Sequence, residues 1–228
     1  MTRSLTLRLV PALFFAAVAL YAPAGDAPAL KKGDRIVFLG DSITAGASGG
    51  TGFITLIKKA LDEKHKDLGI ETINAGVGGN EIHDLQKRVE KDVVAKKPMI
   101  VFIYIGINDV WHHKIPLKTA FESGLKDVIG KITQGGARVI LCTPSVIGEL
   151  KDGKNGQDKY LDEISDVSRG IAKELGLQVC DLRKAFVDYL QSTNPENKGN
   201  GVLTVDSVHL NPEGNKLVAE QMLKALGE

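Results

Sequence analysis

Short apolar segments that alternate with stretches of helical periodicity constrain the fold more than any other feature of this chain. The apolar segments read RIVFLG, IETINAG, MIVFIYIG, ARVILCT and LQVCDL, and they occupy residues 35–40, 70–76, 99–106, 137–143 and 177–182. Between and after them, apolar residues recur every three or four positions in the stretches 53–66, 81–96, 119–133, 160–176 and 212–227. Strands that are apolar throughout and alternate with helices form parallel sheets covered on both faces. The sequence therefore predicts a three-layer α/β/α fold around a parallel sheet.

The first 24 residues have the layout of a secretory signal peptide. Arg3 and Arg8 precede the uncharged run PALFFAAVALY, and the small residues Ala22 and Ala24 follow it. This run is shorter than the ~20 apolar residues that span a bilayer. We expect a signal peptide at 1–24, a single mature domain at 25–228 without a stable membrane span, and a secreted or periplasmic protein. An uncleaved N-terminal anchor is the alternative.

Charge and cysteine content exclude several classes of partner and site. The 228 residues carry a net charge of +1, and acidic and basic side chains are interspersed rather than gathered in a basic stripe. Nucleic acid is therefore not an expected partner, and nothing here indicates the oligomeric state. Cys142 and Cys180 each lie near the end of a predicted strand without C-x-x-C spacing. We expect two buried free thiols, and a disulfide between neighbouring strands is the alternative.

Polar, glycine-rich segments begin where four of the predicted strands end. They read GDSIT, NAGVGGN, GIND and CTPS, at residues 40–44, 74–80, 106–109 and 142–145. The carboxyl ends of parallel strands form the ligand-binding edge of such a sheet. These segments are therefore expected to converge at one edge, where Ser42 is either part of a plain strand-to-helix turn or a nucleophile.

The other candidate site residues are one asparagine, three glycines and an Asp-x-x-His pair. Asn108 either makes an Asx turn or donates a hydrogen bond into the crevice. Gly76, Gly78 and Gly79 either allow positive φ at a helix entry or expose a backbone N–H to an anion. Asp206 and His209 either belong to a surface loop or form a base with its orienting carboxylate. The residue types alone leave these alternatives open.

Together, GDSIT, NAGVGG, GIND and DSVH, in this order, resemble the four blocks of the SGNH hydrolases, the GDSL-like lipases and esterases. The resemblance implies a flavodoxin-like five-stranded sheet with strand order 2-1-3-4-5. It implies a catalytic triad of Ser42, His209 and Asp206. It also implies an oxyanion hole formed by Ser42, Gly79 and Asn108, with Gly78, one position away, as the alternative glycine. Asn80 departs from the pattern, because many members carry Asp there.

The family resemblance implies a serine ester hydrolase that uses no cofactor or metal and acts on a small-molecule or polysaccharide ester. The export signal and the polar character of the segments 144–158 and 191–211 favour short acyl groups, above all acetyl groups, on carbohydrate. The alternatives are a lipid acyl hydrolase of the lysophospholipase or thioesterase type and a non-catalytic carbohydrate-binding relative. A phosphate-binding protein is disfavoured, because the chain contains no G-x-x-x-x-G-K-[ST] motif.

Other residues near these blocks invite a functional interpretation. Trp111, the single tryptophan, is expected to line the substrate pocket, or else to pack beneath its loop. His112 and His113 are adjacent, but no partner at suitable spacing indicates a metal site. Asp41 is expected to fasten the turn by hydrogen bonds. Glu149 is expected to lie in a solvated loop, and a place at the edge of a substrate groove is the alternative.

Overall fold

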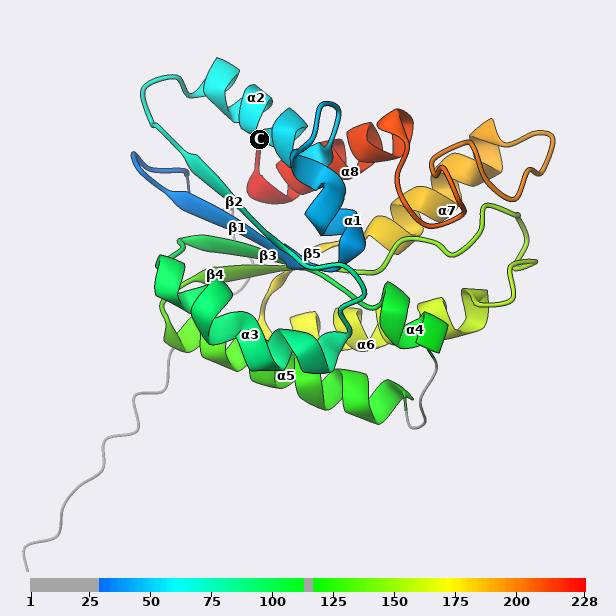
Figure 1. Ribbon diagram of the computed structural model, residues 1–228, viewed down its shortest axis with the longest axis horizontal. Helices are drawn as coiled ribbons and strands as arrows, with labels where there is room; N and C mark the ends of the chain where they lie inside the picture. Colours follow the sequence, from blue (N-terminus) through cyan, green and yellow to red (C-terminus); the bar gives the residue numbers. More distant parts are fainter. Residues whose placement is uncertain (1–28, 113–116) are drawn as a thin grey trace, which may run out of the picture.

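A five-stranded parallel sheet forms the middle layer of the protein (Figure 1). The computed structural model describes residues 29–112 and 117–228, so the predicted signal peptide at 1–24 lies outside the described residues. The strands are β1 (Arg35–Gly40), β2 (Glu71–Gly76), β3 (Ile100–Tyr104), β4 (Arg138–Cys142) and β5 (Gln178–Cys180). Their order is β2-β1-β3-β4-β5, and every neighbouring pair is parallel. The predicted fold class and strand order are confirmed, and so are the strand positions apart from the end of the predicted strand 177–182.

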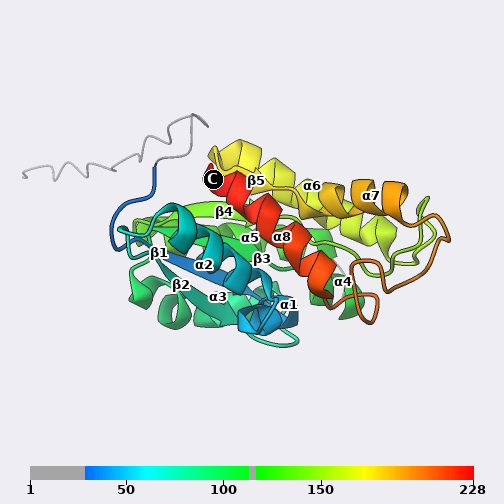
Figure 2. The ribbon, with the colours of Figure 1, turned by 90° about the horizontal axis from the view of Figure 1, so that it is seen from above.

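Helices cover both faces of the sheet, as Figures 1 and 2 show. One face carries α2 (Phe53–Lys64), α7 (Leu182–Thr193) and α8 (Pro212–Leu226), and the other carries α3 (Ile82–Asp92), α5 (Leu117–Gln134) and α6 (Asp158–Leu175). The short helices α1 (Ser42–Ala45) and α4 (Ile107–His112) follow β1 and β3, and the 3₁₀ turns η1 (Gly46–Ser48) and η2 (Val94–Lys96) follow α1 and α3. Among residues 29–112 and 117–228, no helix combines the length and apolar character needed to cross a membrane.

Helix α7 is an element that the sequence analysis did not predict. Its buried positions Leu182, Phe186 and Leu190 recur every four residues, which is a helical repeat. Asp181 caps the helix, because its side chain accepts a hydrogen bond from the backbone N–H of Lys184. The predicted strand 177–182 therefore ends early, and the helix begins where the apolar run was assigned to the strand.

The centre of the core is built from aromatic rings on adjacent strands. Phe38 on β1 and Phe102 on β3 are register partners, and their rings stack with centroids 5.2 Å apart. Phe53 of α2 meets Phe38 edge to face at 6.1 Å. All three side chains are buried. This packing fixes the two central strands, whose carboxyl ends carry the GDSIT and GIND segments.

The two cysteines lie side by side at the ends of neighbouring strands. Cys142 of β4 and Cys180 of β5 are register partners, and both are buried and free. Burial, together with the neighbouring Cys180 thiol, raises the pKa of the Cys142 thiol well above its usual range. The expectation of two buried free thiols is confirmed.

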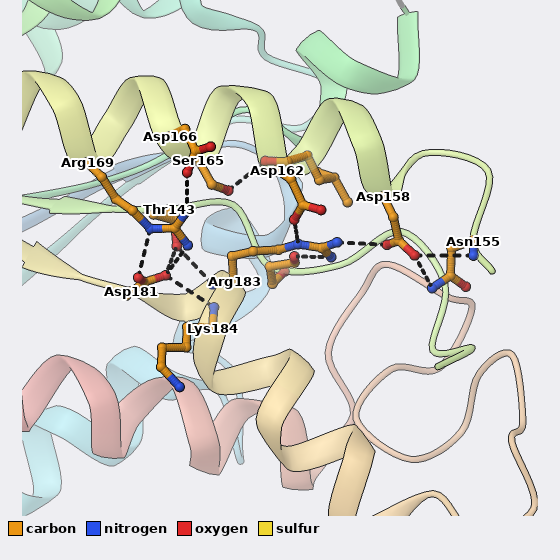
Figure 3. Close-up of polar contacts among 12 residues, drawn as sticks. Thr143, Asn155, Asp158, Asp162, Ser165, Asp166, Arg169, Asp181, Arg183 and Lys184 are labelled. Carbon is orange, nitrogen blue, oxygen red and sulfur yellow. Dashed lines mark hydrogen bonds and ion pairs between the residues drawn. The ribbon is translucent and has the colours of Figure 1, made fainter. Parts of the chain in front are cut away.

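Two arginines connect α6 and α7 near the end of β4 (Figure 3). Arg169 of α6 donates to both carboxylate oxygens of Asp181 at 2.9 Å. Arg183 at the start of α7 is buried and donates to Asp158 at 2.8 Å and to Asp162 at 2.7 Å, both on α6. Bidentate and buried Arg–Asp contacts are geometrically demanding. They fasten the start of α7 to α6, whose first residue follows the loop 143–157, and this loop packs against the candidate site described next.

Candidate active site

Ser42 is the first residue of α1, directly beyond the end of β1. Asp41 caps this helix, since its Oδ1 accepts a hydrogen bond from the backbone N–H of Ile43 at 3.0 Å. Burial raises the pKa of Asp41 to about 6, although the Ile43 bond and the nearby His209 oppose the shift. Asp41 fastens the turn through hydrogen bonds, as the sequence analysis expected.

Two glycines allow α1 to lie directly on the strand ends. A β carbon on Gly40 would lie 2.4 Å from the carbonyl oxygen of Tyr104, and one on Gly76 would lie 2.2 Å from the backbone nitrogen of Ala45. Gly76 is therefore needed for the close approach of α1 to the end of β2. Of Gly76, Gly78 and Gly79, only Gly79 has a positive φ, of 75°, so the expectation of positive φ applies to that residue and not to the other two.

The structure brings Ser42, His209 and Asp206 into one hydrogen-bonded chain. Ser42 Oγ lies 2.9 Å from His209 Nε2, and His209 Nδ1 lies 2.7 Å from Asp206 Oδ2. Asp206 Oδ1 accepts hydrogen bonds from the backbone N–H groups of His209 and Val208 at 2.8 and 3.1 Å. Partial burial works to raise the pKa of Asp206, but the contacts from His209 outweigh it and hold that pKa below its usual range. The carboxylate is thus charged beside the imidazole.

Glu149 anchors the segment that carries Asp206 and His209, and the expectation of a solvated Glu149 is wrong. Its side chain is fully buried. The carboxylate accepts hydrogen bonds from the backbone N–H groups of Val202, Leu203 and Thr204 at 2.7, 2.8 and 2.6 Å, and from the Thr204 hydroxyl at 2.7 Å. These donors replace the water that a buried carboxylate loses.

The loops 143–157 and 194–211 also contact each other through their backbones. Gly148 N–H donates to the carbonyl of Ser207 at 2.8 Å, and Glu149 N–H donates to Gly199 at 2.9 Å. Thr204 and Leu210 form an isolated antiparallel bridge that closes the turn around Asp206. The two loops therefore form one packed unit, and this unit carries the histidine that lies opposite Ser42.

The glycine loop also lies beside Ser42, and Asn108 contacts this loop. A β carbon on Gly78 would lie 3.9 Å from the Ser42 β carbon, which places this loop beside the serine. Asn108, on α4, donates one amide hydrogen to the carbonyl of Asn80 at 3.1 Å. A side-chain amide carries two hydrogens, so a second donor remains. The structure thus brings Asn108 against the predicted glycine segment, and this segment lies beside Ser42.

Asp109 fastens α4 to the start of α3. Its Oδ1 accepts a hydrogen bond from the backbone N–H of Ile82 at 3.0 Å. The carboxyl is 7% exposed, and its Oδ2 has no hydrogen-bond partner among the described residues. Burial raises the pKa of Asp109 to about 6, and the Ile82 bond opposes that shift. Asp109 was not predicted as a site residue, because its partner is a backbone group, which no residue type marks.

Three large apolar side chains are exposed on the segments that carry these groups. Trp111 is 51% exposed, one helical turn after Asn108 on α4. Val77 is 43% exposed in the glycine loop, and Val205 is 63% exposed next to Asp206. Exposed apolar groups around a polar site are typical of a surface that contacts a ligand. Trp111 does not pack beneath its loop.

His112, the last residue of α4, contacts the carboxylate of Glu81 at the start of α3. Its Nδ1 lies 2.7 Å from Glu81 Oε1. Across residues 29–112 and 117–228, no group of three or more His, Cys, Asp or Glu side chains is arranged to hold a metal ion. His113 lies outside the described residues.

Comparison with known proteins relates this geometry to ester hydrolases. Residues 38–217 match the GDSL-like lipase/acylhydrolase family. An acetylxylan esterase of Geobacillus stearothermophilus is 31% identical over 216 residues, which cover 86% of this chain and 95% of that protein. The crystal structure of the acetyl xylan esterase AlAXEase superimposes with a TM-score of 0.81 at 41% identity, covering 84% of this chain and 99% of that one.

A solved structure of the Geobacillus enzyme, Axe2, has a TM-score of 0.76 at 29% identity, covering 87% of this chain and 96% of that one. Variants of Axe2 described as catalytic mutants carry alanine in place of a serine, an aspartate or a histidine. The family match spans most of this chain and includes every segment of the site. The chain therefore belongs to the GDSL-like lipase/acylhydrolase family and is a carboxylic ester hydrolase.

Proposed function

We propose that this protein removes acetyl groups from acetylated carbohydrate, with Ser42 as nucleophile. The observation that carries the proposal is the hydrogen-bonded chain from Ser42 Oγ through His209 to Asp206, at 2.9 and 2.7 Å. Serine is a weak nucleophile until a base takes its proton, and an imidazole held by a carboxylate is suited to that task.

The reaction proceeds in two halves. Ser42 Oγ attacks the ester carbonyl carbon as its proton passes to His209 Nε2, and Asp206 stabilises the imidazolium through Nδ1–H. The tetrahedral intermediate collapses, and the departing sugar oxygen takes the proton from His209. Water then attacks the acetyl-enzyme, with His209 again acting as base, and acetate leaves. No step requires a metal or a cofactor.

The negative oxygen of the intermediate is held by the backbone N–H groups of Ser42 and Gly79 and by the second amide hydrogen of Asn108. The positive φ of Gly79 supports this role, and so does its place next to Gly78, whose β carbon would lie 3.9 Å from that of Ser42. One such donor is typically worth about 3 kcal/mol of barrier. Gly79 is favoured over Gly78, because the family resemblance implies Gly79 and because Gly79, unlike Gly78, has the left-handed conformation that glycine adopts most readily.

The substrate proposal rests on the relatives that are named acetylxylan esterases and on the surroundings of Ser42. Trp111 offers a flat apolar face on which a sugar ring can stack, one turn from Asn108. Acetylated polysaccharide is too large to enter a cell intact, which fits the expected export through a signal peptide at 1–24. Mass spectrometry of the exported protein tests that expectation, with Gly25 as the expected N-terminus.

The test compares the purified protein with its Ser42→Ala variant. Hydrolysis of p-nitrophenyl acetate, butyrate and octanoate is measured first, and then acetate release from acetylated xylan and acetylated pectin. We expect the protein to prefer acetate and to release acetate from polysaccharide, and we expect the variant to be inactive. A preference for octanoate would replace the carbohydrate substrate with a lipid. A folded protein no faster than its variant would overturn the catalytic proposal and favour a carbohydrate-binding role.

A further inference from the structure

Arg88 on α3 joins the end of β1, which leads to Ser42, to the glycine loop that follows β2. Its side chain is 15% exposed, and its guanidinium donates to Asp92 on the same helix and to three acceptors outside that helix. Nη2 donates to the carbonyl of Gly40 at 2.8 Å, Nη1 to the carbonyl of Ala75 at 2.8 Å, and Nε to Asn80 Oδ1 at 2.7 Å. One planar group thus occupies three acceptors on two strand ends and one loop.

The positions of these acceptors relate Arg88 to the proposed chemistry. Gly40 ends β1, two residues before Ser42. Ala75 and Asn80 lie on either side of the glycine loop, which contains Gly79. Arg88 therefore fixes the distance between the turn that presents the serine and the loop that presents the backbone N–H of Gly79.

Asn80 extends this arrangement to the third proposed oxyanion donor. Its side chain is held by Arg88, and its backbone carbonyl accepts one amide hydrogen of Asn108 at 3.1 Å. That bond orients the Asn108 amide, because the two hydrogens of one amide point in fixed directions from the same nitrogen. With one hydrogen directed to Asn80, the direction of the other is determined.

We propose that Arg88 is a positioning residue for the oxyanion hole, acting through Asn80 on both Gly79 and Asn108. This inference rests on the proposed function. Donors stabilise an oxyanion only where they already point at its position, and small displacements are costly. Lysine cannot substitute, because a single ammonium lacks the planar fork that serves three acceptors at once.

A purely structural role for Arg88 is the competing explanation. Arg88 also contacts Asp92 at 3.2 Å, four residues along α3, and such partly exposed helical pairs contribute little. A structural role would lower the melting temperature and the amount of active enzyme. It would not change how the enzyme discriminates between two substrates that differ only at the carbonyl oxygen.

The experiment therefore measures that discrimination in the full chain. Each protein is assayed with p-nitrophenyl acetate and with its thionoester, in which sulfur replaces the carbonyl oxygen and accepts hydrogen bonds poorly. The variants are Arg88→Lys and, on the other side of the contact, Asn80→Ala and Asn80→Asp. Arg35→Lys is the matched control, because Arg35 also donates to a backbone carbonyl, that of Lys96, but at the opposite end of β1.

We expect Arg88→Lys and Asn80→Ala to lower kcat for the ester at least about tenfold, with a much smaller effect on the thionoester. The preference for the ester should fall accordingly. Asn80→Asp, which keeps an acceptor for Arg88, should retain a larger preference than Asn80→Ala, and Arg35→Lys should match the unmodified protein.

Two results would overturn the inference, and they differ from a failure of the proposed function. Parallel losses on both substrates in folded Arg88→Lys and Asn80→Ala would assign Arg88 a structural role. An unchanged kcat in both would assign it no role in the site. If the unmodified protein hydrolyses the ester but shows no preference over the thionoester, the proposed oxyanion hole is itself wrong, and Arg88 has nothing to position.

Discussion

The carboxyl of Asp109 should make the stability of the fold depend on pH, and Asp109→Asn should remove that dependence. The side chain is 7% exposed, and only one of its oxygens has a hydrogen-bond partner among the described residues. Burial, assisted by the negative charges of Glu81 and Asp41, raises its pKa from 3.8 to about 6, against the opposing bond from Ile82.

The sign of the effect follows from proton binding. Between about pH 4 and pH 6 the folded protein keeps a proton on Asp109 that the unfolded chain has lost, so the free energy of unfolding falls as the pH rises. The stabilisation is fully present below the unfolded pKa of 3.8 and is lost as the pH passes the folded pKa of about 6. A shift of this size corresponds to about 3 kcal/mol. Asparagine carries no charge and keeps an oxygen for Ile82, so the variant escapes this loss.

Urea denaturation of both proteins at intervals between about pH 4 and pH 8 measures the difference. The free energy of unfolding of Asp109→Asn, relative to the unmodified protein, should rise by about 3 kcal/mol across this range. Asp41 is present in both proteins, so its own titration largely cancels. Asp67→Asn, at an exposed carboxyl, is the control and should show no such rise. If the free energies of unfolding of Asp109→Asn and of the unmodified protein change in parallel with pH, the reasoning is refuted.

Three further predictions follow from the site and the core. Asn108→Ala should lower kcat for p-nitrophenyl acetate about a hundredfold; a loss below about threefold in a folded variant would exclude an oxyanion role. Glu149→Gln should lower the free energy of unfolding by at least about 2 kcal/mol in urea, because its amide must face a backbone N–H; unchanged stability would contradict the anchoring role. Cys142 and Cys180 should react with a thiol reagent only after unfolding, and rapid labelling of the native protein would contradict their burial.

The sheet and most of its helices could be predicted because they depend on local apolar periodicity. The predicted strand 70–76 is β2, Glu71–Gly76, and the predicted helix 160–176 is α6, Asp158–Leu175. Helix α7 was missed for a local reason as well. The apolar run that contains Cys180 continues into Leu182, so the strand prediction absorbed the first residue of the helix.

The part of the candidate site that lies at strand ends could be predicted from the sequence in the same way. Strand ends converge at one edge of a parallel sheet, so the segments that carry Ser42 and Asn108 had to meet. The loop that carries Asp206 and His209 is not a strand end, and only the resemblance to a family placed it there. Its observed position depends on Glu149, which the sequence assigned to a solvated loop.

Arg88 and Glu149 were beyond sequence reasoning for one physical reason: their main partners are backbone groups. The Glu149 carboxylate accepts hydrogen bonds from N–H groups of the loop that leads to His209. The Arg88 guanidinium donates to the carbonyls of Ala75 and Gly40, at the ends of the strands next to the glycine loop. Every residue type except proline offers the same backbone N–H and C=O, so no pattern of letters marks such partners. A buried charge satisfied by backbone holds a loop in one conformation. The proposed reacting groups can therefore be recognised from their residue types, whereas the buried Glu149 and the half-buried Arg88 that contact their segments become visible only in the fold.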